Sequence, residues 1–162
     1  FEIFKIITGN NYQGSIQLQD LINLPHRLEK TIINNRAVII NDSKSTNTDS
    51  LKYALSKVSD DSSLHLILMG NPDKERYDSF LLSRPQYLYI CGKHAEQLSN
   101  KIDHHNKSIF KSLEDTLKHI NHNFSGNVEI LFSPGNPSGR DYKNFEERGE
   151  HFLILAQEIF ND

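Results

Sequence analysis

Apolar positions along the chain fall into two alternating patterns from residue 28 onward. Short apolar runs predict β-strands, and apolar residues spaced three and four apart predict amphipathic helices. Strands are expected within 29–41, 63–70, 86–92, 106–110 and 127–135. Helices are expected within 48–58, 74–83, 93–102, 112–122 and 142–160.

This alternation predicts the fold class. Strands that alternate with helices form βαβ units, and such units build a sheet of parallel strands covered on both faces. Residues 29–41 differ, because the pair Asn34-Asn35 tolerates positive φ and favours a hairpin turn. The expected fold is therefore α/β: a Rossmann-like, mostly parallel sheet with helices on both faces, plus an antiparallel edge strand or hairpin near the N-terminus.

Residues 1–27 do not follow the alternation. Leu24 precedes Pro25, which disfavours helix at that position, so residues 24–27 are expected to be a domain boundary. The chain also begins at Phe1 without an initiator methionine. We therefore expect residues 1–27 to be the end of a preceding domain and a linker, and residues 28–162 to form one domain.

Four polar, Gly- and Pro-rich loops follow predicted strands, at 41–47, 69–74, 91–94 and 133–145. In parallel sheets the carboxyl ends of the strands meet at one edge, where ligands bind. The four loops are therefore expected to lie together and to form the functional site.

The loop at 41–47, "NDSKSTN", carries an acid and a base two positions apart. In an extended segment Asp42, Lys44 and Thr46 would point to the same side. A carboxylate can hold a ribose hydroxyl, and an ammonium can neutralise a phosphate. A surface ion pair beside a helix cap explains the same spacing equally well, so the residues alone leave both interpretations open.

Two other loops offer groups for an anion. Lys74 precedes a predicted helix, where a cation is unfavourable unless it has an anionic partner, although a solvated lysine is the ordinary interpretation. The segment "SPGNPSG" places hydroxyls and backbone amides before the last helix, which suits a carboxylate or phosphate. Neither G-x-x-x-x-G-K-[ST] nor G-x-G-x-x-G occurs, so the chain does not bind a nucleotide in either of those ways.

Composition excludes several other classes. The net charge of −3 lacks the basic surface that nucleic-acid binding needs, and no apolar run is long enough for a membrane span. The single cysteine, Cys91, lies at the end of an apolar run and is expected to be a buried thiol. The histidines at 103–105 and 119–122 lack carboxylate or cysteine partners at defined offsets, so no metal site is predicted.

Several segments together resemble one known family. They are "LPHRLEK", "INDSKSTNTDSLKYAL", "GNPDK", "YICGKHAEQL" and "LFSPGNPSGRDYKNFEERGEHFLILAQEI", in this order from about Leu24 to the C-terminus. They resemble the C-terminal domain of the Mur ligases, and among these the members that add D-glutamate.

The resemblance implies an ATP-dependent ligase of peptidoglycan precursor synthesis in the bacterial cytoplasm, working as a monomer. Its partners would be D-glutamate, UDP-N-acetylmuramoyl-L-alanine and ATP, with no nucleic acid and no membrane. The cofactors ATP and Mg²⁺ would be bound mainly by a central domain that this chain lacks. The fragment alone is expected to be inactive.

The resemblance also implies roles for individual residues. Lys44 would be catalytic, and Asp42 and Asn41 would contact the nucleotide. Substrate would be bound by Thr46, Lys74, Ser138, Gly139 and Phe145.

The sequence departs from the family pattern at two places. Asn71 and Pro72 precede Asp73-Lys74 where glycines are usual, and Gly139 replaces a larger apolar residue. Two alternatives stay open: a related amino-acid ligase, either another Mur enzyme or a folylpolyglutamate synthase, and a non-catalytic α/β module that binds a small anion.

Overall fold

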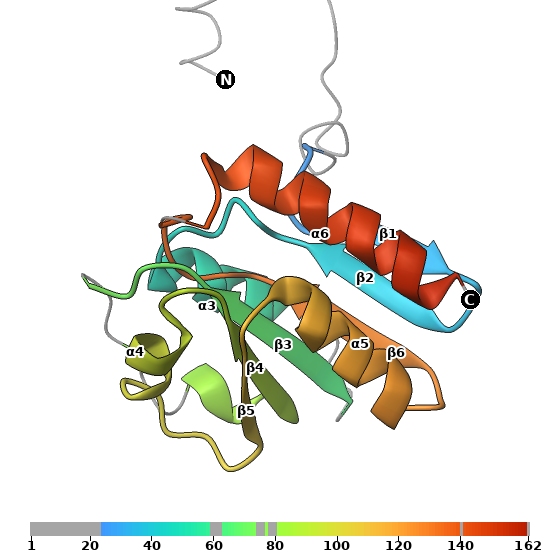
Figure 1. Cartoon of the computed structure of the whole chain (residues 1–162), viewed down its shortest axis with the longest axis horizontal. Helices are drawn as coiled ribbons and strands as arrows, with labels where there is room; N and C mark the ends of the chain where they lie inside the picture. The colour runs from blue at the N-terminus through green and yellow to red at the C-terminus, as the bar shows by residue number, and fades with distance from the viewer. Residues whose placement is uncertain (1–23, 59–62, 74–76, 78–80, 140, 162) are drawn as a thin grey trace, which may run out of the picture.

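A computed structural model of the chain describes residues 24–58, 63–73, 77, 81–139 and 141–161 (Figure 1). The part of the linker prediction that concerns residues 1–23 lies outside these residues. So does Lys74.

The strands form one six-stranded sheet in the order β1-β2-β6-β3-β4-β5. β1 pairs with β2 antiparallel, and every other neighbouring pair is parallel. The predicted fold class is confirmed, including the antiparallel edge strand near the N-terminus. The strands are β1 (Glu29–Ile33), β2 (Ala37–Asn41), β3 (Leu64–Met69), β4 (Tyr87–Cys91), β5 (Lys107–Phe110) and β6 (Val128–Phe132).

The predicted hairpin turn is also confirmed. Asn34 and Asn35 have φ values of 49° and 52°, and the Arg36 N–H donates to the Ile33 carbonyl at 3.0 Å. Two successive residues at positive φ match the right-handed twist of the flanking strands, and asparagine tolerates this conformation better than most residues do.

Three of the helices begin at residues whose side chains cap them. Asn47, Ser112 and Asn144 accept hydrogen bonds from backbone N–H groups of the first turns of α3, α5 and α6. Such caps replace hydrogen bonds that the first turn of a helix cannot make internally. The helices are α3 (Thr48–Lys57), the 3₁₀ turn η1 (Leu81–Ser83), α4 (Ala95–Ser99), α5 (Leu113–Asn123) and α6 (Phe145–Phe160).

Helices cover both faces of the sheet. α5 and α6 lie side by side on one face, where Ile39, Phe132 and Phe152 are buried (Figure 1). α3 and α4 contribute to the apolar cluster of the other face. None of the helices among the described residues is long and apolar enough to span a membrane.

Two predicted helices differ from the structure. Within 74–83 the described residues form only the η1 turn, and Tyr77 lies in no helix. Within 93–102 the helix is limited to Ala95–Ser99. His94 provides no side-chain cap for this helix, and the residues after it continue in turns.

Candidate functional site

The loops after β2, β6, β3 and β4 lie next to one another, as the strand order requires and as the sequence predicted. Hydrogen bonds connect them in pairs: the Asn71 N–H donates to the Pro137 carbonyl at 3.2 Å, and the Lys93 N–H donates to Asp141 Oδ1 at 3.1 Å. The carboxyl edge of the sheet is therefore one connected surface.

The loop after β2 does not continue as an extended segment. The Ser45 N–H donates to the Asp42 carbonyl at 2.9 Å, and residues 43 and 44 form a turn. The expected row of Asp42, Lys44 and Thr46 on one side of an extended strand is thus wrong. Thr46 is half-buried between this turn and the start of α3.

Asp42, predicted to contact a nucleotide, is buried and bonded inside the domain. Its two carboxylate oxygens accept from the Ser133 hydroxyl at 2.7 Å and from the Leu28 N–H at 3.3 Å. Burial raises the pKa of Asp42 from 3.8 to about 6, although both hydrogen bonds and the charge of Arg27 act to lower it. The Asp42 carboxylate therefore connects the end of β2 to Leu28, just before β1, and to Ser133, just after β6.

Asn41, the other predicted nucleotide contact, is also internal. Its Nδ2 donates to the Gly149 carbonyl at 3.2 Å and lies 2.9 Å from His26 Nδ1. Its Oδ1 accepts from the Ser43 N–H at 3.2 Å. Asn41 thereby connects His26, β2 and α6.

Lys44 is the half-buried cation of this loop. Its Nζ lies 3.9 Å from the centre of the Phe145 ring, a cation–π contact that links two predicted site residues. Its backbone N–H donates to the His26 carbonyl at 3.1 Å. The contact orients the ammonium while leaving part of the side chain open to a ligand.

The loop after β6 is buried at its start and exposed at its tip. Asn136 is fully buried, and its amide donates to the Pro134 carbonyl at 2.8 Å and to the Met69 carbonyl at 3.4 Å. Ser138 is half-buried and Gly139 is exposed. The rigid start of the loop thus presents a hydroxyl and a glycine at the surface.

The loop after β3 approaches the β6 loop closely. Gly70 has a φ of 108°, and a Cβ at this position would lie 2.2 Å from the Pro137 carbonyl oxygen, so only glycine fits. The Asp73 N–H donates to Asn71 Oδ1 at 3.1 Å, which closes a turn through an asparagine side chain. This turn directly precedes Lys74.

Sequence reasoning assigned no role to two residues that adjoin the Ser138-Gly139 turn. A Cβ at Gly139 would lie 3.5 Å from both the Asn71 nitrogen and His94 Cδ2. His94 follows β4 in the "CGKH" loop, so its position at the edge was foreseeable from the strand pattern, although its proximity to Gly139 was not.

Sequence reasoning also missed Arg148 of α6, which is 0% exposed. Its guanidinium donates to the Ser43 hydroxyl at 3.1 Å, the Ser43 carbonyl at 2.7 Å and the Asn136 carbonyl at 3.1 Å. No sequence signal marks it, because an arginine within "FEERG" is expected to be exposed on a helix.

The described residues of the edge loops include two groups that suit an anion, the half-buried Lys44 ammonium and Ser138 hydroxyl. Among the described residues no group of three His, Cys, Asp or Glu side chains is placed to hold a metal ion. Of two carboxylates at this edge, Asp42 has a hydrogen bond on each oxygen, whereas Asp141 Oδ2 is buried without a hydrogen bond among the described residues. The arrangement suits a ligand that carries carboxylate or phosphate groups.

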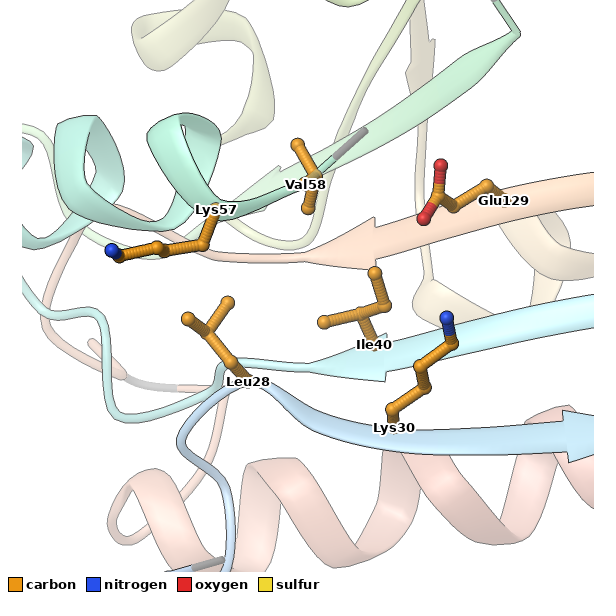
Figure 2. Close-up of a pocket in the computed structure, with 6 residues that line it drawn as sticks. All are labelled: Leu28, Lys30, Ile40, Lys57, Val58 and Glu129. Atoms are coloured by element: carbon orange, nitrogen blue, oxygen red, sulfur yellow. The ribbon is translucent and has the colours of Figure 1, made fainter. Parts of the chain in front are cut away.

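A cleft of about 200 Å³ lies elsewhere, on the sheet face that carries α3. Figure 2 shows Leu28, Ile40 and Val58 projecting into one space, with Lys30 and Glu129 at one end and Lys57 at the other. None of the predicted site residues lines this cleft. The candidate site is therefore the surface of the edge loops.

Solved structures show which fold the chain shares. The fold resembles that of the MurF ligase from Thermotoga maritima, whose structure contains ADP, with a TM-score of 0.57 and 13% sequence identity. The match covers 90% of this chain and 34% of the MurF chain. The chain therefore has a fold found in Mur ligases.

Sequence relatives narrow the class of protein. UDP-N-acetylmuramoylalanine--D-glutamate ligase of Buchnera aphidicola subsp. Baizongia pistaciae is 33% identical, with coverage of 89% of this chain and 33% of the relative. The same ligase of Buchnera aphidicola subsp. Schizaphis graminum is 34% identical, with coverage of 88% and 33%. No protein-family model matches the chain. The resemblance to the Mur ligases is confirmed: the chain is similar in sequence to proteins named as D-glutamate ligases of this kind and spans about a third of their length.

Proposed function

We propose that residues 28–162 form the C-terminal domain of an ATP-dependent ligase that adds D-glutamate to UDP-N-acetylmuramoyl-L-alanine. The domain binds the incoming amino acid and closes the site, and residues 1–27 are the end of a central domain and a linker. The observation that carries the proposal is the sequence relationship to D-glutamate ligases over nine-tenths of the chain.

In the proposed reaction the terminal phosphoryl group of ATP is transferred to the substrate carboxylate, which gives an acyl phosphate and ADP. The amine of D-glutamate then attacks the acyl carbon, a C–N bond forms, and phosphate leaves. ATP and Mg²⁺ are held mainly by the part of such a ligase that this chain does not span, and bound Mg²⁺ would neutralise phosphate charge.

The chain's own residues would position D-glutamate and neutralise charge. Lys44 stabilises the negative charge that develops during acyl transfer, because a fixed cation costs little reorganisation at the moment of reaction. Thr46, Lys74 and the Ser138-Gly139 turn bind the two carboxylates of D-glutamate. The contact between Phe145 and the Lys44 ammonium supports an orienting part for this ring.

Asn41 and Asp42 would serve the nucleotide side of the site indirectly. Their internal hydrogen bonds support a role in holding the loop after β2, rather than a direct contact in the form of the domain described here. We further propose that the whole ligase acts as a monomer in the bacterial cytoplasm, without a nucleic-acid or membrane partner.

The test is a chimeric ligase in which residues 24–162 replace the corresponding third of the Buchnera aphidicola enzyme. ATP-dependent phosphate release should require D-glutamate, and L-glutamate or L-lysine should not replace it. The chain alone should release no phosphate. A chimera that prefers another amino acid would indicate a different amino-acid ligase, and a folded chimera without any turnover would favour a non-catalytic module.

Substitutions in the chimera test the residue roles. Lys44→Met and Ser138→Ala should each lower kcat/KM for D-glutamate by roughly tenfold or more, since each removes a group placed against charge. Lys52→Met, at an exposed lysine of α3, is the control and should change little. Unchanged kinetics in both site variants would refute these assignments.

A further inference from the structure

Arg148 has an unusual environment for a charged residue. It is the largest of the fully buried side chains, and among the described residues it forms no ion pair with a carboxylate. Its three hydrogen-bond acceptors are instead the hydroxyl and carbonyl of Ser43 and the carbonyl of Asn136. A buried guanidinium is costly, so its partners at this position must be well placed.

The charge is retained despite burial. Desolvation lowers the pKa of Arg148 to about 10, which leaves the guanidinium protonated at neutral pH. Its planar fork reaches acceptors from two loops at once, which a lysine ammonium on a shorter, flexible stem cannot do equally well. The geometry is therefore specific to arginine.

The acceptors belong to the two loops that carry the proposed amino-acid site. Ser43 directly precedes Lys44, and Asn136 lies two residues before Ser138. The Ser43 hydroxyl also donates to the Phe145 carbonyl at 2.8 Å, so the start of α6 joins the same network. Arg148 thus bridges the Lys44 and Ser138 parts of the loops after β2 and β6, whose starts are also joined by the hydrogen bond between Ser133 and Asp42.

We infer that Arg148 is a positioning residue that couples the loop of Lys44 to the loop of Ser138, so that an amino acid held by one loop is held by both. The inference rests on the proposed function for the identity of the ligand. The coupling of the two loops does not depend on the proposed function, and it can be measured without a ligand.

The first test is amide hydrogen exchange of the 162-residue chain, followed by NMR, in the parent protein, Arg148→Lys and Arg148→Met. Exchange of the Lys44 and Asn71 amides, whose hydrogen bonds join neighbouring segments at the edge, should accelerate at least tenfold. The Leu66 amide in the central strand should change less than threefold. Glu150→Gln, an exposed position on the same helix, should match the parent.

Equal acceleration at all amides would assign Arg148 to general core stability and overturn the inference, as would no acceleration. The lysine variant keeps the charge, so it decides the question if the methionine variant does not fold. In the lysine variant, acceleration confined to the edge loops supports the requirement for the guanidinium fork.

The second test is titration with D-glutamate. In the parent protein, amide shifts at Lys44 and Gly139 should saturate together with one Kd, whereas in Arg148→Lys the Kd should rise at least tenfold. An unchanged Kd would overturn the inference and leave the proposed function standing. If the parent protein bound no D-glutamate, the proposed amino-acid role would fail, and the exchange experiment would still decide whether Arg148 couples the loops.

Discussion

Asp42 is a buried negative charge, so its replacement by a neutral asparagine side chain should stabilise the domain at neutral pH. Burial raises its pKa from 3.8 to about 6. A carboxyl group with a higher pKa in the folded than in the unfolded state binds its proton more tightly when folded. Its contribution to stability is therefore fully present below pH 4, falls as the pH rises from about 4 to about 6, and is constant above that.

The magnitude follows from the difference between the two pKa values. Each pH unit corresponds to about 1.4 kcal/mol, so a rise from 3.8 to about 6 costs roughly 3 kcal/mol of unfolding free energy at pH 7. The neutral amide introduced by Asp42→Asn would avoid this cost. Its oxygen can still accept from the Leu28 N–H, and its NH₂ group can donate to the Ser133 hydroxyl in place of the present bond.

The assay is urea unfolding of the parent chain and Asp42→Asn at pH 4, 5, 6 and 7. The difference in unfolding free energy between variant and parent should grow by roughly 2–3 kcal/mol from pH 4 to pH 7. Asp103→Asn, at an exposed carboxylate, is the control and should show a difference below about 0.5 kcal/mol at every pH.

Two results would refute the reasoning about Asp42. A difference that stays constant with pH would mean that folding does not change the pKa of this carboxyl. A difference that shrinks as the pH rises would mean that Ser133, the Leu28 N–H and Arg27 together stabilise the carboxylate by more than burial destabilises it.

Two further substitutions test other parts of the fold. His65 is buried, and desolvation lowers its pKa from 6.5 to about 4, so its contribution to stability is present above pH 6.5 and is lost as the pH falls toward 4, by roughly 3 kcal/mol. His65→Phe should remove this acid-side loss in the same urea series, and a pH profile parallel to the parent's would contradict it. Gly149→Ala places a Cβ 2.3 Å from His26 Nδ1 and should cost about 1–3 kcal/mol by overpacking. Thermal unfolding measures this loss against Gly126→Ala, where a Cβ meets nothing within 4 Å; equal melting temperatures for the two variants would contradict the close packing of His26.

The fold was predictable because its signals are local. The buried strand Leu64–Met69 is a continuous apolar run, and Asn34-Asn35 is a turn pair with a conformational reason. Helix caps such as Asn47 also follow from short-range chemistry. The predicted helix at 93–102 shows the limit: the helix spans only Ala95–Ser99, and His94 before it makes no side-chain cap hydrogen bond.

The position of the four polar loops at one edge of the sheet was predictable from the sequence, but the arrangement of their side chains was not. The βαβ pattern predicts parallel strands, and parallel strands are enough to bring the polar loops to one edge of the sheet. The burial of Arg148 and Asp42 depends on partners that lie 105 and 91 residues away in the chain, Ser43 and Ser133. Residue spacing in the sequence does not predict contacts over such separations. A charged residue that is buried in the structure is therefore expected, from the sequence alone, to be on the surface.

The loop after β2 contains both buried polar residues and a partly exposed one. Asn41, Asp42 and Ser43 are buried and bonded to α6, β1 and the loop after β6, whereas Lys44 is half-buried against Phe145. The first three residues therefore form a frame, and the lysine is the group that the frame presents. Lost activity after substitution of a frame residue has two possible physical origins, a missing ligand contact or a displaced Lys44. Only a frame substitution that lowers activity while leaving the unfolding free energy and the Lys44 amide exchange unchanged would identify a direct contact.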